Sequence, residues 1–206
     1  MQPFLCDSDI VDWRAADVLA LATRLGTGAA DEETIARRCF VWVRDEVRHS
    51  VDYQKVPLTC RASDTLRFGT GFCFAKSHLL VALLRANQIP AGFCYQRLAL
   101  DEAATRFTLH GLVGIHLQRF GWYRVDPRGD KPGIITDFCP PEERLAFAPL
   151  HPGERDVPGI FTEPLLSVVQ FLRSGRTLDE AIQRLPDDDA TQLTQGDEAP
   201  RRAPVA

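Results

Sequence analysis

Apolar residues recur at helical spacing through the first part of the chain, with polar residues between them. Ser8 or Asp9 is a suitable cap for a first helix, which keeps an apolar face and stops at Gly26. A second helix is expected to open at Asp31, and its apolar positions continue to Val47. The pattern therefore predicts two amphipathic helices at the beginning of the chain.

A third apolar helix follows a polar loop over 49–60 and a short helical turn over 63–68. This helix opens at Cys73, directly after a glycine-rich turn. Its inward positions are leucines, namely Leu79, Leu80, Leu83 and Leu84. Pro90 marks the end, because proline lacks the amide hydrogen and restricts the residue before it. We expect this helix to pack into the core.

The pattern changes after Pro90, where strand-like segments replace helical ones. These segments span 91–100, 107–117 and 122–125, and short polar stretches separate them. Helices followed by neighbouring strands indicate an α+β domain, with the N-terminal helices packed on an antiparallel sheet.

The rest of the chain is expected to be irregular first and helical later. Residues 128–157 are rich in proline and glycine, and we expect one helical turn there, over 142–145. A helix is expected over 164–173, and a capping box at Thr177 predicts another.

The composition is typical of a globular domain, with 45% hydrophobic and 25% charged residues among 206. We expect residues 1–186 to form a single domain and 187–206 to form a polar, flexible tail. The net charge of −4 argues against a nucleic-acid-binding surface. No apolar run approaches the ~20 residues that span a bilayer, and the N-terminus lacks the pattern of a secretion signal. These features predict a cytoplasmic protein that binds neither nucleic acid nor membrane.

The six cysteines are expected to be free thiols, because a chain of this length in a reducing compartment does not need disulfides. None of them forms a C-x-x-C pair. Cys39 and Cys94 lie in apolar stretches and are most simply small buried hydrophobes. Only Cys73 combines a preceding glycine turn with a helix start, where the backbone N–H and the helix dipole favour a thiolate.

Two downstream residues complete a possible catalytic set with Cys73. His110 lies on the second predicted strand and Asp126 follows the third. If the connection between these strands makes His116 pair with Trp122, Asp126 falls diagonally across from His110 on the same face. A connection one residue shorter would separate them. The pattern suggests a cysteine nucleophile, an imidazole base and a carboxylate that orients the imidazole.

These segments resemble the bacterial transglutaminase-like superfamily. The similarity lies in Gly71-Phe72-Cys73 before a leucine-rich helix, in the end of that helix over 85–92, and in His110 followed by Gly121-Trp122-Tyr123-Arg124-Val125-Asp126-Pro127. The resemblance covers about 31–127. It implies a papain-like fold in which Cys73 is the nucleophile, His110 the base and Asp126 its partner.

The chain also departs from this family. The family often has an aromatic residue two places after the histidine, whereas here the sequence is His110-Gly111-Leu112. The sequence has no calcium loop of the Asp-x-Asp-x-Asp-Gly type, and no metal or cofactor is expected. Protein cross-linking is therefore not inherited from the family name. Hydrolysis of an amide or peptide substrate through a thioester on Cys73 is the preferred hypothesis.

The oxyanion of such a reaction would be held by the backbone N–H of Cys73 and one further donor. Gln54, in the polar loop, is a candidate for this donor, although a surface role is the simpler interpretation. Gln96, Gln118 and Trp42 are further candidates.

Three alternatives stay open. A small zinc module could use the set Cys73, His78, Cys94 and His110, although their spacing fits no compact ligand pattern. The chain could instead be an inactive, ligand-binding relative. Finally, the same three residues would serve transfer of an acyl group to an amine, as in arylamine N-acetyltransferases.

Overall fold

The computed structural model describes residues 1–187. The helices are η1 (Gln2–Leu5), α1 (Ala16–Gly26), α2 (Glu32–Glu46), α3 (Ser50–Tyr53), α4 (Ala62–Phe68), α5 (Cys73–Ala86), α6 (Leu166–Leu172) and α7 (Leu178–Ile182). The strands are β1 (Arg48–His49), β2 (Thr70–Gly71), β3 (Ala91–Ala99), β4 (Phe107–Leu117), β5 (Gly121–Val125), β6 (Asp137–Cys139), β7 (Glu142–Arg144) and β8 (Arg155–Phe161).

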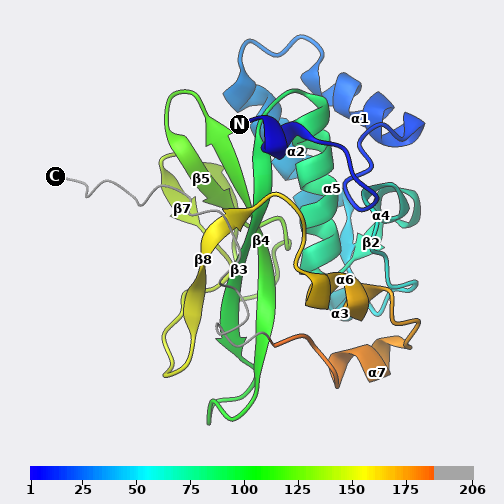
Figure 1. Cartoon of the computed structure of the whole chain (residues 1–206). Coiled ribbons are helices and arrows are strands. Elements are labelled where there is room, and N and C mark those ends of the chain that lie inside the picture. Colours follow the sequence, from blue (N-terminus) through cyan, green and yellow to red (C-terminus); the bar gives the residue numbers. More distant parts are fainter. Residues whose placement is uncertain (188–206) are drawn as a thin grey trace, which may run out of the picture.

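Four strands form the main sheet, in the order β5-β4-β3-β8, and every neighbouring pair is antiparallel. The helices lie on one side of this sheet, with α5 against it and α1 and α2 farther out (Figure 1). Every residue of α5 from Cys73 to Arg85 is buried, because the helix is covered by the sheet and by the other helices. The α+β class and the antiparallel sheet predicted from the sequence are confirmed.

The strand register agrees with the one assumed from the sequence. His116 pairs with Trp122, and Val113 pairs with Val125, the last residue of β5. The connection between β4 and β5 is therefore the longer of the two considered from the sequence, the one that puts Asp126 and His110 on the same face. Asp126 follows β5 directly, so it lies on the same side of the sheet as His110.

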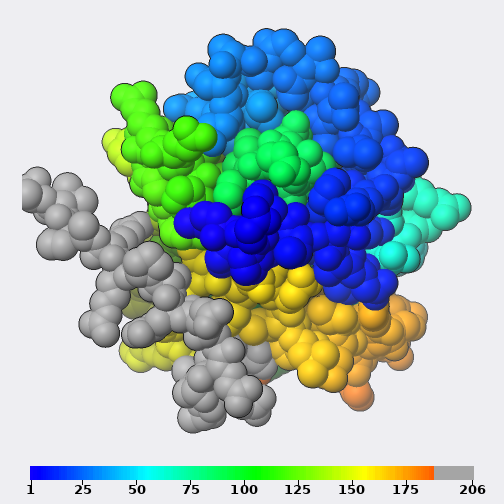
Figure 2. All heavy atoms as spheres, turned by 45° about the horizontal axis from the view of Figure 1, so that its top comes forward, coloured from blue at the N-terminus to red at the C-terminus, as the bar shows by residue number. Residues whose placement is uncertain are grey.

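Local signals explain where two of the long helices begin and end. The Asp31 side chain accepts a hydrogen bond from the Thr34 backbone N–H and caps α2. Helix α5 ends at Ala86, with Asn87 as its C-cap, shortly before Pro90 as predicted. Arg85 near this end is buried, and its guanidinium donates to carbonyl oxygens of Cys6, Ala91 and Thr162. The N-terminal segment that Arg85 helps to hold is dark blue in Figure 2, where it crosses between α5 and β8.

The first helix begins later than the sequence suggested, at Ala16 instead of Ser8 or Asp9. The preceding residues are held in a bent segment by a distant part of the chain. Asp12 accepts hydrogen bonds from the backbone N–H and the hydroxyl of Ser63. Ile10 and Val11 are buried there, so tertiary contacts replace the first predicted turns.

The region predicted to be irregular contains three strands. Residues 142–144 form β7, which pairs with β6, so the helical turn expected at 142–145 is wrong. Strand β8 pairs with β3 and extends the main sheet. The sequence pattern did not indicate this strand, because it contains polar residues, a proline and a glycine. Such residues are tolerated in a strand at the edge of a sheet, which is where β8 lies.

The later helices α6 and α7 are close to their predicted positions, and Thr177 and Glu180 form the expected capping box. Of the predicted tail, residues 188–206 lie outside the described residues. The Arg97 guanidinium donates two hydrogen bonds to the Asp187 carboxylate, from Nε to Oδ1 at 2.7 Å and from Nη2 to Oδ2 at 2.8 Å. Within residues 1–187, no helix has both the length and the apolar character that crossing a bilayer requires.

Candidate active site

Cys73 is the first residue of α5, at the end of a short strand that is buried on both sides. Strand β2 pairs in parallel with β1 and leads through Phe72 into the helix. Gly71 is required here, because a Cβ at this position would lie 2.8 Å from the Ala75 Cβ and 3.1 Å from the Thr59 Oγ1. The tight turn fixes the cysteine at the helix N-terminus, where the backbone N–H groups are free to bind an anion.

Strand β4 approaches this helix start at Gly111. A Cβ on Gly111 would lie 2.9 Å from Phe74 Cδ1 and 3.2 Å from Phe74 Cα. The missing side chain therefore lets the strand backbone come close to α5. The Gly111 N–H donates to the Cys73 Sγ at 3.5 Å. This donor was not identified from the sequence, although a glycine inside a strand is a known sign of close backbone approach.

His110 and Asp126 form a short hydrogen bond, 2.7 Å between Nε2 and Oδ2. Asp126 is fully buried, and its oxygens also accept the backbone N–H groups of Arg128 and Ala146, each at 3.0 Å. The His110 ring meets the Phe147 ring edge to face, with centroids 5.0 Å apart. The carboxylate is thus fixed from two chain segments, and it fixes the imidazole in turn.

Asp126 and His110 each favour the charged form of the other. Burial by itself would raise the pKa of Asp126, but the His110 imidazole and the hydrogen bonds to Asp126 keep that pKa below its usual value. Burial likewise acts to lower the pKa of His110. The Asp126 carboxylate and then Cys73 more than offset this, and the pKa of His110 rises to about 10. Both effects favour the protonated form of the His110 ring, the imidazolium.

Cys73 and His110 line the same cavity, which has a volume of about 500 Å³. Much of its wall is apolar, and this part includes Phe72, Phe74, Leu98, Leu100, Leu109, Phe147 and Leu150. The wall also includes charged and polar residues, among them His49, Asp52, Arg128, Lys131, His151 and Glu154. The cavity thus offers an apolar surface beside the sulfur and ionisable groups around it.

The structure does not bring Gln54 to this cavity. Gln54 is exposed, has a left-handed backbone with a φ of 50°, and uses its side-chain amide to bond the Val51 carbonyl at 2.8 Å. Gln118 is exposed as well, and Trp42 does not line the cavity. Gln96 lies opposite His110 in the register, but its amide donates to Asp156 at 3.0 Å, and it does not line the cavity.

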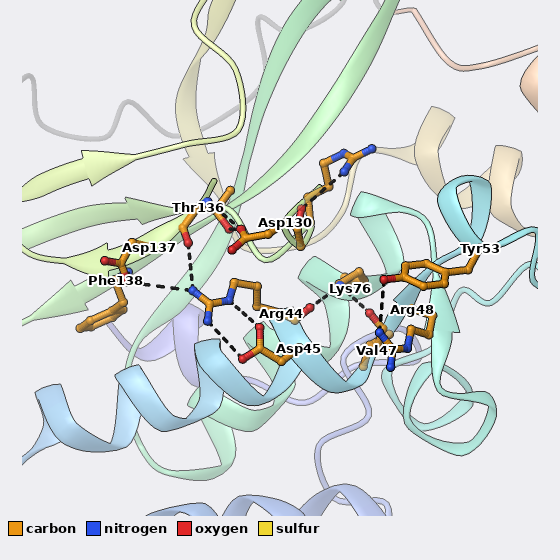
Figure 3. A network of polar contacts seen from close by, with 12 residues as sticks. Arg44, Asp45, Val47, Arg48, Tyr53, Lys76, Asp130, Thr136, Asp137 and Phe138 are labelled. Atoms are coloured by element: carbon orange, nitrogen blue, oxygen red, sulfur yellow. Dashed lines mark hydrogen bonds and ion pairs between the residues drawn. The ribbon is translucent and has the colours of Figure 1, made fainter. Parts of the chain in front are cut away.

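A buried lysine lies one turn beyond Cys73 on α5. The Lys76 ammonium donates to the carbonyl oxygens of Arg44 and Val47 at the end of α2 (Figure 3). Burial lowers the pKa of Lys76 to about 7, against the opposing effect of Asp126. The contact satisfies carbonyl groups that the end of a helix leaves free, and it ties α2 to the start of α5.

The other cysteines lack this setting, and all six are free. Burial raises the pKa of Cys39 and of Cys94 to about 12, as expected for small buried hydrophobes. His78, proposed above as a zinc ligand, contacts the Cys60 carbonyl through Nδ1 at 2.7 Å. In the part of the chain that the structure describes, no three His, Cys, Asp or Glu side chains are placed to hold a metal ion.

Comparison with solved structures gives matches to part of the chain. A candidate cysteine protease from Cytophaga hutchinsonii is 22% identical over 62% of this chain and 41% of its own, with a TM-score of 0.48. The periplasmic domain of TgpA from Pseudomonas aeruginosa is 23% identical over 60% of this chain and 45% of its own, with a TM-score of 0.46. The chain spans less than half of either structure. A comparison with curated proteins found no match.

A family model described as the transglutaminase-like superfamily matches residues 19–127. This range contains Cys73, His110 and Asp126, and it covers more than half of the chain. The protein therefore belongs to the transglutaminase-like superfamily.

Proposed function

We propose that this protein is a cysteine-dependent enzyme that hydrolyses or transfers an acyl group, with an amide or peptide as substrate. The observation that carries this proposal is the arrangement around the Cys73 sulfur. It lies at a helix N-terminus, receives the Gly111 N–H at 3.5 Å, and shares a cavity with an imidazole bonded to Asp126 at 2.7 Å. Membership of the superfamily is consistent with this chemistry.

The proposed reaction begins with the Cys73 thiolate and the His110 imidazolium. Because Asp126 binds Nε2, the other ring nitrogen, Nδ1, is the one available to the sulfur. The sulfur attacks the carbonyl carbon, and the backbone N–H of Cys73 donates to the oxyanion. The C–N bond then breaks, the leaving amine takes the proton from His110, and the acyl group stays on Cys73 as a thioester.

The second half of the reaction releases the acyl group to an acceptor. With water as the acceptor the product is a carboxylic acid, and with an amine it is a new amide. The apolar wall of the cavity favours an acyl group with an apolar side chain, because burying such a side chain contributes about 1.5–3 kcal/mol. We place hydrolysis first, since water needs no binding site of its own.

Site-resolved alkylation tests the nucleophile directly. The protein is treated with iodoacetamide across a pH series, and mass spectrometry measures each cysteine separately. Cys6 is exposed and serves as the internal reference. We expect Cys73 to react at a pH well below the one that Cys6 requires, and we expect His110→Ala to remove this advantage. A Cys73 that reacts like an ordinary thiol, with a pKa of about 8.5, in both proteins would contradict the proposal.

Product analysis separates hydrolysis from transfer. An activated ester is incubated with the protein, with and without a primary amine. Acid as the product under both conditions supports hydrolysis, and an amide that grows with amine concentration supports transfer. Cys73→Ser is the matched control, because it preserves the shape of the site and replaces the thiolate with a much weaker nucleophile.

A further inference from the structure

The chain returns to the cavity of Cys73 after its last helix. Figure 1 shows it leaving α7 and running back to the sheet, where Leu185-Pro186-Asp187, here called the return segment, lies against β4. Leu185 lines the cavity together with Cys73 and His110. Its side chain is partly buried and packs against the core. The reaction described above gives this segment no role.

The edge of β4 is open where the return segment lies, because β5 pairs with β4 only over 113–117. In the open part, the Gly111 N–H donates to the Cys73 Sγ at 3.5 Å. The Leu109 N–H donates to the Pro186 carbonyl at 2.7 Å. Alternate N–H groups of a strand point to the same edge. One strand edge therefore binds both the nucleophile and the return segment.

The two contacts are spaced as an extended peptide would need them. Leu109 and Gly111 are two residues apart, which is about 7 Å along a strand. A peptide that pairs with β4 at Leu109 would therefore reach the sulfur within about two residues. Addition of a peptide to an open strand edge is a common mode of recognition, in which backbone bonds give affinity and side-chain pockets give specificity.

A guanidinium fixed on β3 binds the acidic end of the return segment. Arg97 donates two hydrogen bonds to the Asp187 carboxylate, at 2.7 and 2.8 Å. The same guanidinium lies 3.7 Å from the centre of the Phe107 ring and donates to the Gly153 carbonyl at 2.9 Å. These two contacts hold it in position to bind a carboxylate.

The backbone contact of the return segment is incomplete because of its proline. An ordinary residue opposite Leu109 in an antiparallel pair can exchange two backbone hydrogen bonds, whereas Pro186 has no N–H to donate. The Leu109 carbonyl accepts from the Thr108 hydroxyl, at 3.2 Å. A peptide with another residue at this position gains the second backbone bond, so it can displace the return segment.

We propose that the substrate is an extended peptide that pairs with the open edge of β4, and that the return segment competes with it inside the same chain. This inference rests on the proposed function. The peptide has an apolar side chain in place of Leu185, a residue with an N–H in place of Pro186, and a carboxylate in place of Asp187. The return segment leaves β4 when the peptide binds, so its own stability there lowers the apparent affinity for the peptide.

Peptide binding to the Cys73→Ser protein tests this without turnover. The probe is a fluorescein-labelled peptide that contains Arg-Leu-Ala-Asp between glycines, and fluorescence anisotropy measures its Kd. Loosening the return segment should lower this Kd. We expect a decrease of about fivefold in Asp187→Ala, which removes the pair with Arg97. We expect about tenfold in Leu185→Ser, which removes the apolar contact.

The matched control is Leu166→Ser. This leucine is 70% exposed at the start of α6 and does not line the cavity. Its Kd should equal that of the Cys73→Ser parent, which would show that loss of a leucine elsewhere does not affect the probe.

Two changes in the probe test its contacts separately. Proline in place of the alanine should raise the Kd about fivefold, because the N–H that bonds the Leu109 carbonyl is lost. Asparagine in place of the aspartate should also raise the Kd, because the charge that Arg97 binds is lost. In Arg97→Gln the aspartate and asparagine probes should bind equally.

Either of two results would overturn the inference alone. One is the same Kd, or no binding, in the parent protein, Asp187→Ala and Leu185→Ser. The other is equal binding of the alanine and proline probes. Circular dichroism identifies a variant that does not fold, and Asp187→Ala, at an exposed position, then decides. Probe binding as expected, in a protein whose wild type never acylates Cys73, would overturn the proposed function and support the competition.

Discussion

The two histidine–carboxylate pairs of the cavity contain the same residue types and differ in their chemistry. His110 and Asp126 are 2.7 Å apart, and the pKa of His110 is raised to about 10. His49 and Asp52 are 3.4 Å apart, and the pKa of His49 is lowered to about 3. Burial acts on both rings in the same direction, so the opposite outcomes come from the charged groups around each ring.

The difference lies in what else each carboxylate binds. Besides His110, Asp126 accepts two backbone N–H groups, which carry no net charge. Asp52 pairs with Arg128 and Lys131, and Arg128 also lowers the pKa of His49 against the effect of Asp52. Proximity of a carboxylate is therefore not enough to protonate a buried histidine, because the carboxylate must also be free of competing cations.

The largest expected effect comes from breaking the pair of His110 and Asp126. In Asp126→Asn the shape stays, but the amide has one acceptor oxygen where the carboxylate has two, so one of the two backbone contacts is lost together with the charge that holds the His110 proton. We expect kcat to fall on the order of 10⁴-fold and the reaction of Cys73 with iodoacetamide to require a higher pH. Asp52→Asn is the control and should leave the alkylation profile in place. An active Asp126→Asn protein would show that the first pair is structural.

Removing Arg128 should make the pair of His49 and Asp52 more like the pair of His110 and Asp126. Arg128 is buried and bonded to Asp52, so Arg128→Gln should lower the free energy of unfolding by about 2–3 kcal/mol. With the competing cation gone, the pKa of His49 should rise from about 3 toward the ordinary value of about 6.5. Denaturant unfolding measures the first effect and NMR titration of the imidazole measures the second. Lys131 also pairs with Asp52 but is exposed, so Lys131→Gln should change the free energy of unfolding and the pKa of His49 less than Arg128→Gln does.

A third buried imidazole, His78, has no carboxylate beside it and shows what burial does by itself. Burial lowers the pKa of His78 to about 4. The unfolded chain then binds more protons below about pH 6.5, and stability is lost as the pH falls from there toward 4. Between about pH 7.5 and pH 5 this histidine should reduce the free energy of unfolding by about 2 kcal/mol.

The variant His78→Asn tests this effect, because its amide can still bond the Cys60 carbonyl. Its unfolding free energy, measured in urea at both pH values, should depend less on pH than that of the wild type. Equal pH dependence in the two proteins would mean that the ring is not held neutral. His151→Asn, at an exposed position, is the control.

The smallest effect is expected from Phe147, the aromatic residue that contacts His110. The Phe147 ring meets the His110 ring at 89°, a contact that contributes about 0.5–1.5 kcal/mol. Phe147→Leu should therefore lower kcat/KM by less than about tenfold. Phe120→Leu, on the turn between β4 and β5, should not change it. A loss as large as that of Asp126→Asn would mean that Phe147 holds the imidazole in place.

Part of the site could be predicted because its signals are local. Gly71 before Cys73 marks a tight turn into a helix, and the alternation along β4 and β5 places His110 and Asp126 on one face in one of the two registers considered, the one that is observed. The cap at Asp31 and the capping box at Thr177 are likewise short-range patterns, and both are observed. Such features depend on residues within a few positions of one another, which the sequence displays directly.

Other features depend on contacts between distant segments. The first helix starts late because Asp12 bonds to Ser63, fifty-one positions away. Strand β8 exists because β3 offers it an edge, and its own sequence has little alternation. Gln54, a candidate from its place in the polar loop, uses its amide on the nearby Val51 carbonyl. Sequence spacing did not show which loop residues face the cavity.

The sequence by itself determined the α+β order and the helix that opens at Cys73, and it reduced the meeting of His110 and Asp126 to the choice between two hairpin connections. These follow from periodicity, capping and the glycine turn, which act over short distances. Only the tertiary structure decided that His49 reaches the same cavity, that Gly111 donates to the sulfur, and that Asp52 is shared with two cations. The charge of each imidazole depends on burial and on neighbours from other segments, so no short stretch of the chain specifies it.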